Sequence, residues 1–171
     1  MRSTPVHPTR RWMRIARFVA TGALLVAALY LIRRFDTVST SPSDDSARPF
    51  YAPASTLLLD SFDPLATRGR PHVAFRISGE QGFRIGRVLA RAGQKVSVES
   101  STRGAELSVD GAPTGVRMRA FDDAGLCVGV VPPDAVFVLS LVPGSGVPDS
   151  RTLGPLRSAQ IAGRVLFQLP W

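Results

Sequence analysis

The sequence has few of the residues that most often build reactive or metal-binding sites. It contains one cysteine, Cys127, one lysine, Lys95, and two histidines, His7 and His72. A single cysteine excludes an internal disulfide and any metal site made of several cysteines. Cys127 lies in the apolar run 126–131, so we expect it to be a small buried hydrophobic residue. The single lysine matters later, because it limits where a lysine base could stand.

Metal and phosphate sites are equally poorly represented. Two histidines, one cysteine and two isolated aspartate pairs, at 44–45 and 122–123, do not form the ligand set of a metal site. The stretch Gly144-Ser145-Gly146 lacks the lysine and hydroxyl residue that complete a phosphate-binding loop, and is typical of a flexible loop. We therefore expect no cofactor and no metal.

Acidic residues are absent from the first 34 positions, which carry seven of the 21 basic residues. Residues 35–171 carry the other 14 basic residues and all 13 acidic ones, so this part is close to neutral. A nucleic-acid-binding protein would carry its basic surface on the folded domain. The net charge of +8 therefore does not indicate nucleic acid, since the excess charge flanks a hydrophobic segment instead.

That segment predicts a membrane anchor. Residues 18–32 contain no charge, and residues 15–34 are long enough, at about 1.5 Å per residue, to span a hydrocarbon core of about 30 Å. A cleaved signal peptide is the alternative, but no small-residue cleavage site follows the apolar run closely. The residues expected to face lipid or neighbouring helices include Phe18, Gly22, Leu25, Leu29 and Ile32.

Flanking charge predicts the orientation of this anchor. Residues 1–17 hold five arginines and no acid, whereas residues 33–50 hold three arginines and three aspartates. Positive flanks remain on the cytoplasmic side. We therefore expect a cytoplasmic tail over residues 1–14, an anchor helix over 15–34, and a periplasmic remainder in a bacterial inner membrane.

The rest of the chain predicts an all-β domain. Residues 35–55 are rich in Ser, Thr, Pro and Asp, which is typical of an extended linker. Residues 56–171 contain about eight short β-rich runs separated by Gly, Pro and Asp, with no long helical period, which favours a β-barrel or sandwich. The expected strands cover residues 72–78, 84–91, 94–99, 106–109, 115–121, 126–131, 135–141 and 161–169, with a hairpin turn at Asp110-Gly111.

Residues 84–166 resemble the type I signal peptidase family, including the related peptidases that process conjugative pilins. Arg87–Val96 (RVLARAGQKV) resembles the family pattern R-V-x-x-x-P-G-D-x-V, and Glu106–Pro113 (ELSVDGAP) resembles its hairpin L-x-V-N-G-x-P. The longest likeness, to V-P-x-x-x-Y-F-V-L-G-D, D-S-R-x-x-G-P-V and I-x-G-R-V in turn, covers Val131–Leu139, Asp149–Leu156 and Ile161–Val165. The order and approximate spacing of these pieces carry the resemblance.

The resemblance implies a membrane-bound serine peptidase with a lysine base. The family's nucleophile pattern S-M-x-P-T-L is matched in part by Ser61, which has Pro64 three residues later and Gly69 eight residues later. A serine that simply begins a turn before Pro64 is the equal alternative. The family places its lysine one residue before the R-V pair, and that position here is Gly86.

Gly86 therefore removes the base that a serine hydroxyl needs. Arg87 stays protonated and cannot replace a lysine, and we expect Lys95, nine residues after Gly86, to point to solvent. His72 is the remaining candidate base for Ser61, with Asp60 or Asp63 as its partner, although a lone histidine on a strand is more often structural. Asp149 and Arg151, which flank Ser150, are expected to form an ion pair that holds a loop.

Three functions remain open from the sequence, one of which is a chaperone or assembly factor that captures extended peptides by strand addition. The leading one is a non-catalytic pseudoenzyme, an accessory or structural subunit of an inner-membrane complex, that keeps the β domain as a binding surface. Its partners would be the lipid bilayer and other membrane subunits or an extended peptide, but no nucleic acid. The alternative is a membrane serine endopeptidase that processes signal peptides or pilins through Ser61 and a non-standard base.

Overall fold

The protein is described here from a computed structural model, which covers residues 8–40, 47, 49–52, 54–62, 71–80, 82–101, 104–118, 126–142 and 147–170. The chain divides into two compact units, Met1–Arg34 and Phe35–Trp171. We call the second unit the β domain. The aspartate pairs at 44–45 and 122–123, and also His7, Asp63, Pro64, Gly69 and 144–146, lie outside the described residues.

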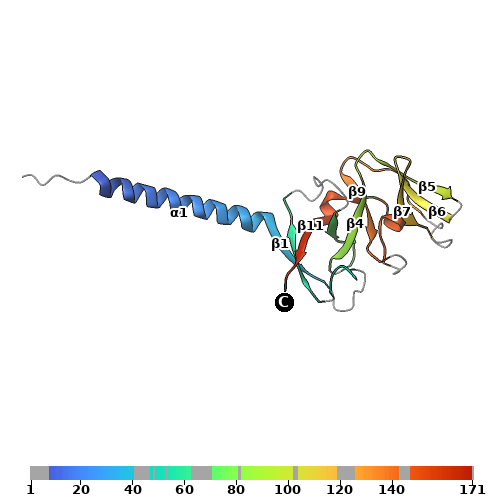
Figure 1. Cartoon of the computed structure of the whole chain (residues 1–171), viewed down its shortest axis with the longest axis horizontal. Helices are drawn as coiled ribbons and strands as arrows, with labels where there is room; N and C mark the ends of the chain where they lie inside the picture. Colours follow the sequence, from blue (N-terminus) through green and yellow to red (C-terminus); the bar gives the residue numbers. More distant parts are fainter. Residues whose placement is uncertain are drawn as a thin grey trace, which may run out of the picture. The chain divides into compact units, whose positions relative to one another are not determined.

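The first unit is a single helix, α1 (Pro8–Arg34), shown in blue in Figure 1. Its segment Trp12–Arg34 is long and apolar enough to cross a membrane. Phe18, Leu25, Leu29 and Ile32 expose between 61% and 80% of their surface, and Gly22 is also exposed. The helix thus contains one candidate membrane span. The helix itself begins at Pro8, seven residues before the predicted start of the anchor.

The β domain contains two antiparallel sheets, which confirms the mainly β fold expected from the sequence. The larger sheet has the strand order β1-β2-β11-β3-β4-β9-β10, and the smaller one β7-β6-β5-β8. The larger sheet consists of β1 (Phe35–Ser39), β2 (Thr56–Asp60), β3 (His72–Phe75), β4 (Arg84–Arg91), β9 (Ala135–Ser140), β10 (Leu156–Arg157) and β11 (Ile161–Gln168). The smaller sheet consists of β5 (Lys95–Ser101), β6 (Gly104–Val109), β7 (Ala112–Arg117) and β8 (Gly129–Val130).

Two short helical elements follow β9. These are α2 (Ser150–Leu153) and the 3-10 turn η2 (Ser158–Gln160), which lie on either side of β10. The two sheets share one core cluster, to which β4 and β9 contribute Leu89 and Phe137 and the smaller sheet contributes Val96 and Leu107. Figure 1 shows β5, β6 and β7 gathered at one end of the β domain, away from β1 and β11.

The larger sheet has an apolar cluster on each face, because side chains alternate along a strand. Val73 and Phe75 of β3 pack with Val138 in one cluster. Ala74, the residue between them, packs with Leu59 and other residues in a second cluster. We call the described residues Ala47, Pro49–Ala52 and Ala54–Ser55 the strap. The strap contributes Ala47 and Tyr51 to the second cluster. We therefore call the face with the second cluster the strap face, and the face with the first cluster the inner face.

The predicted linker over residues 35–55 is wrong for its first residues. Phe35–Ser39 form β1, which pairs with β2 along its full length. Val38 is buried in the strap-face cluster, and Thr40 Oγ1 hydrogen-bonds to the carbonyl oxygens of Ala52 and Ser55. An edge strand needs only one side chain facing the core, so a mostly polar composition does not prevent it from joining the sheet.

The strand boundaries of the β domain agree with the sequence pattern where turn residues set them. β4 has the predicted bounds, and the hairpin at Asp110-Gly111 connects β6 to β7 with positive φ angles of 53° and 77°. That pair of angles is typical of the type I′ turn. β7 begins at Ala112, directly after the turn and earlier than predicted, and the apolar run 126–131 contributes only the two-residue strand β8.

Candidate functional site

Ser61 directly follows β2, and its hydroxyl is an unusual group in the β domain. The Oγ atom is buried and has no hydrogen-bond partner among the described residues. A buried hydroxyl without a partner costs roughly 1–3 kcal/mol, and such groups in native proteins often have a functional reason. Residues 63–70, which follow it closely, lie outside the described part of the chain.

Asp60, the residue before Ser61, is held by an ion pair across the sheet. Its carboxylate lies 3.6 Å from the guanidinium of Arg164 on β11, and it also accepts a hydrogen bond of 3.3 Å from the backbone N–H of Phe62. Asp60 is 8% exposed, whereas the side chain of Arg164 is 31% exposed, so the carboxylate is shielded from water but its partner is only half-buried. The Asp60 carboxylate is therefore engaged by Arg164 and by the Phe62 N–H, both close to it in the fold.

The position that would hold the family's lysine lies well away from Ser61. Register pairs connect Asp60 to Arg164, Arg164 to Val73, Val73 to Gly86, and Gly86 to Ser140. Gly86 is thus three strands from Asp60 in the same row. At about 4.8 Å per strand this is roughly 14 Å along the sheet, which is too far for a side chain at Gly86 to hydrogen-bond to the Ser61 hydroxyl.

Gly86 also has no room for a side chain. A Cβ built there would lie 2.5 Å from Val138 Cγ1, 2.8 Å from the carbonyl oxygen of Leu139 and 3.0 Å from Phe75 Cε1. Val138 and Phe75 are fully buried on the inner face. The glycine is therefore required by the packing of three neighbouring strands, and the β domain leaves no space for a lysine at this position.

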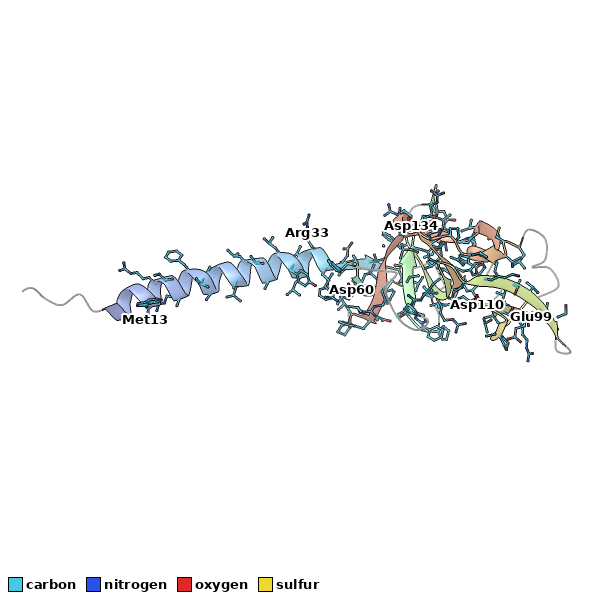
Figure 2. The ribbon with its side chains drawn as sticks, turned by 90° about the horizontal axis from the view of Figure 1, so that it is seen from above. Met13, Arg33, Asp60, Glu99, Asp110 and Asp134 are labelled. Carbon is cyan, nitrogen blue, oxygen red and sulfur yellow. The ribbon has the colours of Figure 1, made fainter. Side chains whose placement is uncertain are left out.

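Lys95, the single lysine of the chain, lies in the other sheet. It begins β5, is exposed, and its backbone N–H donates to Asp110 Oδ1 over 2.7 Å. Figure 2 shows Asp110 well separated from Asp60 along the length of the β domain. The side chain of Lys95 is exposed, as expected. It belongs to the other sheet and is not placed to act as a base for Ser61.

His72 is occupied by the strap. The Tyr51 hydroxyl and His72 Nδ1 are 2.7 Å apart, and the rings of Phe50 and Tyr51 both make edge-on contacts with the imidazole, with centroids 5.1 Å and 5.6 Å away. Burial, assisted by the nearby Arg87 guanidinium, lowers the pKa of His72 below its ordinary 6.5. Burial raises the pKa of Tyr51 above 10.0.

The structure does not bring Ser61 and His72 together. Arg164 pairs with both Asp60 and Val73, so β2 and β3 stand on opposite sides of β11 and run in the same direction. His72 precedes Val73, whereas Ser61 follows Asp60. Two strand spacings and two residues therefore separate them, or about 12 Å between Cα atoms. The described contacts of His72 are those of a residue that holds the strap in place.

The segment Asp149-Ser150-Arg151 is held in place by an ion pair and by hydrogen bonds to β9. Asp149 forms the ion pair with Arg151, 2.9 Å long, and its Oδ2 accepts the backbone N–H of Ser140. Ser150 Oγ accepts the backbone N–H of Val138 over 2.9 Å. Asp149 and Ser150 are 1% and 0% exposed. Together they fix the start of α2 to β9, beside the row that contains Gly86.

The comparisons with known proteins give no family for this chain. No protein-family model matches it, and no curated protein matches it significantly. The likeness to type I signal peptidases therefore rests on the residues quoted from the sequence.

The sequence pattern did not predict two contacts of the candidate site, Tyr51 with His72 and Asp60 with Arg164. Tyr51 lies 21 residues before its partner His72, in a segment whose composition predicted a linker, and Arg164 lies more than 100 residues after Asp60. The aromatic pair Phe50-Tyr51 in an otherwise polar segment was the available signal for the first contact. Nothing in the local sequence indicates the second.

Proposed function

We propose that this protein is a membrane-anchored, non-catalytic subunit of a bacterial inner-membrane protein complex, with its β domain in the periplasm as a binding module. The observation that carries the proposal is Gly86, where neighbouring strands fill the space that a lysine base would need. A serine hydroxyl is a poor nucleophile unless a base accepts its proton. Arg87 cannot act as that base, and Lys95 lies in the other sheet.

The anchor and its charges support the location. The span Trp12–Arg34 is long and apolar enough to cross a bilayer, and the arginine excess on its amino-terminal side favours a cytoplasmic amino terminus. The carboxyl-terminal β domain then stands on the periplasmic side. There it would bind the folded parts of neighbouring subunits or an extended peptide.

The test is co-purification of the tagged full-length protein from its native membranes in a mild detergent, with partners identified by mass spectrometry. The proposal predicts a stoichiometric and reproducible set of membrane partners, and the same set with Ser61→Ala. Isolation of the chain alone, at the mass of a monomer, would contradict it. A partner set that Ser61→Ala changes would mean that the hydroxyl has a role that the proposal does not include.

A membrane serine endopeptidase is the second candidate, and the buried, unpartnered hydroxyl of Ser61 favours it. Such a group fits a site that is completed by a substrate or by a base from another subunit. This candidate predicts that processing of a signal-like or pilin-like peptide stops in Ser61→Ala. Processing that continues in Ser61→Ala and in His72→Ala would exclude it.

A further inference from the structure

The arginines at the start of α1 gather on one side of the helix. At 3.6 residues per turn, positions 10, 11, 14 and 17 fall within an arc of about 120°, and all four are arginine. Trp12 and Ala16 occupy the opposite side. We call the four positions the arginine face. Arg14 and Arg17 are exposed.

Nothing in this helix neutralises that face. The first 34 residues contain no aspartate or glutamate, and like charges three or four positions apart destabilise a helix. All of these charges are arginine, as are 20 of the 21 basic residues of the chain. The planar guanidinium differs from an ammonium because it binds a phosphate group with two parallel hydrogen bonds.

The spacing along α1 places this face at the level of lipid phosphates. Nineteen residue steps separate Arg14 from Arg33, or about 28 Å along the helix axis, and a hydrocarbon core is about 30 Å thick. With Arg33 at one boundary of the bilayer, Arg14 lies at the other, and Arg17 reaches the same boundary by extending its side chain towards the headgroups.

We propose that the arginine face of α1 binds the phosphates of anionic phospholipids, such as phosphatidylglycerol, in preference to zwitterionic ones. This inference rests on the proposed membrane anchoring and extends it to the choice of lipid. A zwitterionic headgroup carries its own cation, which competes with the guanidinium for the phosphate. An anionic headgroup leaves the phosphate available, and the negative surface potential of such lipids attracts the basic segment further.

Trp12 provides a local reporter for the test. The chain has two tryptophans, so Trp171→Phe leaves Trp12 as the only one, at the same depth along the helix as the arginine face but on its other side. The full-length variant is reconstituted into vesicles in which either phosphatidylglycerol or phosphatidylcholine carries brominated acyl chains, at the same mole fraction. Because bromine quenches a tryptophan only at short range, the ratio of the two quenching efficiencies measures which lipid surrounds Trp12.

The proposal predicts stronger quenching by the brominated anionic lipid, a difference that decreases as salt is raised. Arg14→Gln with Arg17→Gln should bring the ratio severalfold closer to one. The matched control Arg14→Ala with Ala16→Arg keeps composition and charge but moves one arginine to the opposite side of the helix, so it should also lower the ratio. A ratio of one for the parent chain, or a ratio that neither double variant changes, would overturn the proposal.

Failure of this inference can be distinguished from failure of the proposed anchoring. Extraction of the same vesicles with alkaline carbonate reports whether the chain is integral to the bilayer. A chain that resists extraction but shows no lipid preference overturns only the role of the arginine face. A chain that is extracted overturns the anchor itself, and the inference with it.

Discussion

Replacing Gly86 with alanine should destabilise the β domain more than most glycine-to-alanine changes. Non-bonded carbon atoms are in favourable contact at about 3.5–4.0 Å, whereas the new Cβ would lie 2.5 Å from Val138 Cγ1 and 2.8 Å from the Leu139 carbonyl oxygen. The second atom belongs to the backbone of β9, where Leu139 pairs with Arg87 of β4 and the N–H of the next residue, Ser140, is held by Asp149, so it cannot move without disturbing these contacts.

Overpacking of this kind typically costs about 1–3 kcal/mol, and we expect Gly86→Ala near the upper end of that range. For a domain of this size the loss corresponds to a decrease in Tm of roughly 10 °C. Thermal unfolding of the full-length protein in detergent, followed by near-ultraviolet circular dichroism, measures it. Gly86→Lys, which introduces the lysine found at the matching position of type I signal peptidases, should be more harmful still, because it adds a long side chain and a charge to an apolar cluster.

Gly163 provides the matched comparison within the same sheet. A Cβ there would lie 3.0 Å from the Asp60 carbonyl oxygen and 3.0 Å from Leu59 Cβ, which is tight but less severe. Gly163→Ala should therefore cost less than Gly86→Ala. If Gly86→Ala is as stable as the parent protein, the packing around Gly86 does leave room for a side chain. The same conclusion follows if Gly86→Lys folds normally and acquires peptidase activity that depends on Ser61.

Three further predictions concern Asp149, His72 and Ser61. Asp149→Ala should lower the free energy of unfolding by about 3 kcal/mol in denaturant titrations, because it leaves the Arg151 guanidinium and the Ser140 N–H without their buried acceptor; an effect below about 1 kcal/mol would show that this loop is not held as described. The pKa of His72 is lower in the folded than in the unfolded state, so the unfolded state binds more protons. Its contribution to stability should be complete above about pH 6.5 and decrease as the pH falls below that value, and His72→Gln, the control, should flatten this part of the stability–pH curve. Ser61→Ala should leave stability unchanged or raise it by up to about 1 kcal/mol, because it removes a buried hydroxyl that has no described partner; a clear loss of stability would show that the hydroxyl is satisfied.

The sequence predicted those parts of the fold that local patterns determine. β4 follows from an apolar pattern that ends at a Gly93 turn, and the β6–β7 hairpin follows from Asp110-Gly111, whose positive φ angles few other residue pairs tolerate. β1 escaped prediction because its single buried side chain, Val38, gives no periodic signal among polar neighbours. Its place in the sheet depends on pairing with β2, which lies about twenty residues later.

The candidate site was less predictable than the fold because its geometry depends on residues from distant strands. That Gly86 stands where the resemblance would place a lysine follows from the sequence alone. That no side chain fits there follows only from Val138 and Phe75, which belong to the two strands beside β4. Likewise His72 is, from the sequence, a candidate base or a structural residue, and its contact with Tyr51 depends on where the strap lies against the sheet.

Covalent labelling measures most directly whether Ser61 has a base that activates its hydroxyl. A fluorophosphonate reacts with activated serines, and mass spectrometry of the full-length protein in its native membranes locates the modified residue. If Ser61 has no base, its labelling should not exceed the background seen in Ser61→Ala. Stoichiometric labelling of Ser61 in the parent protein would establish an activated serine in this β domain and overturn the proposal of a non-catalytic subunit.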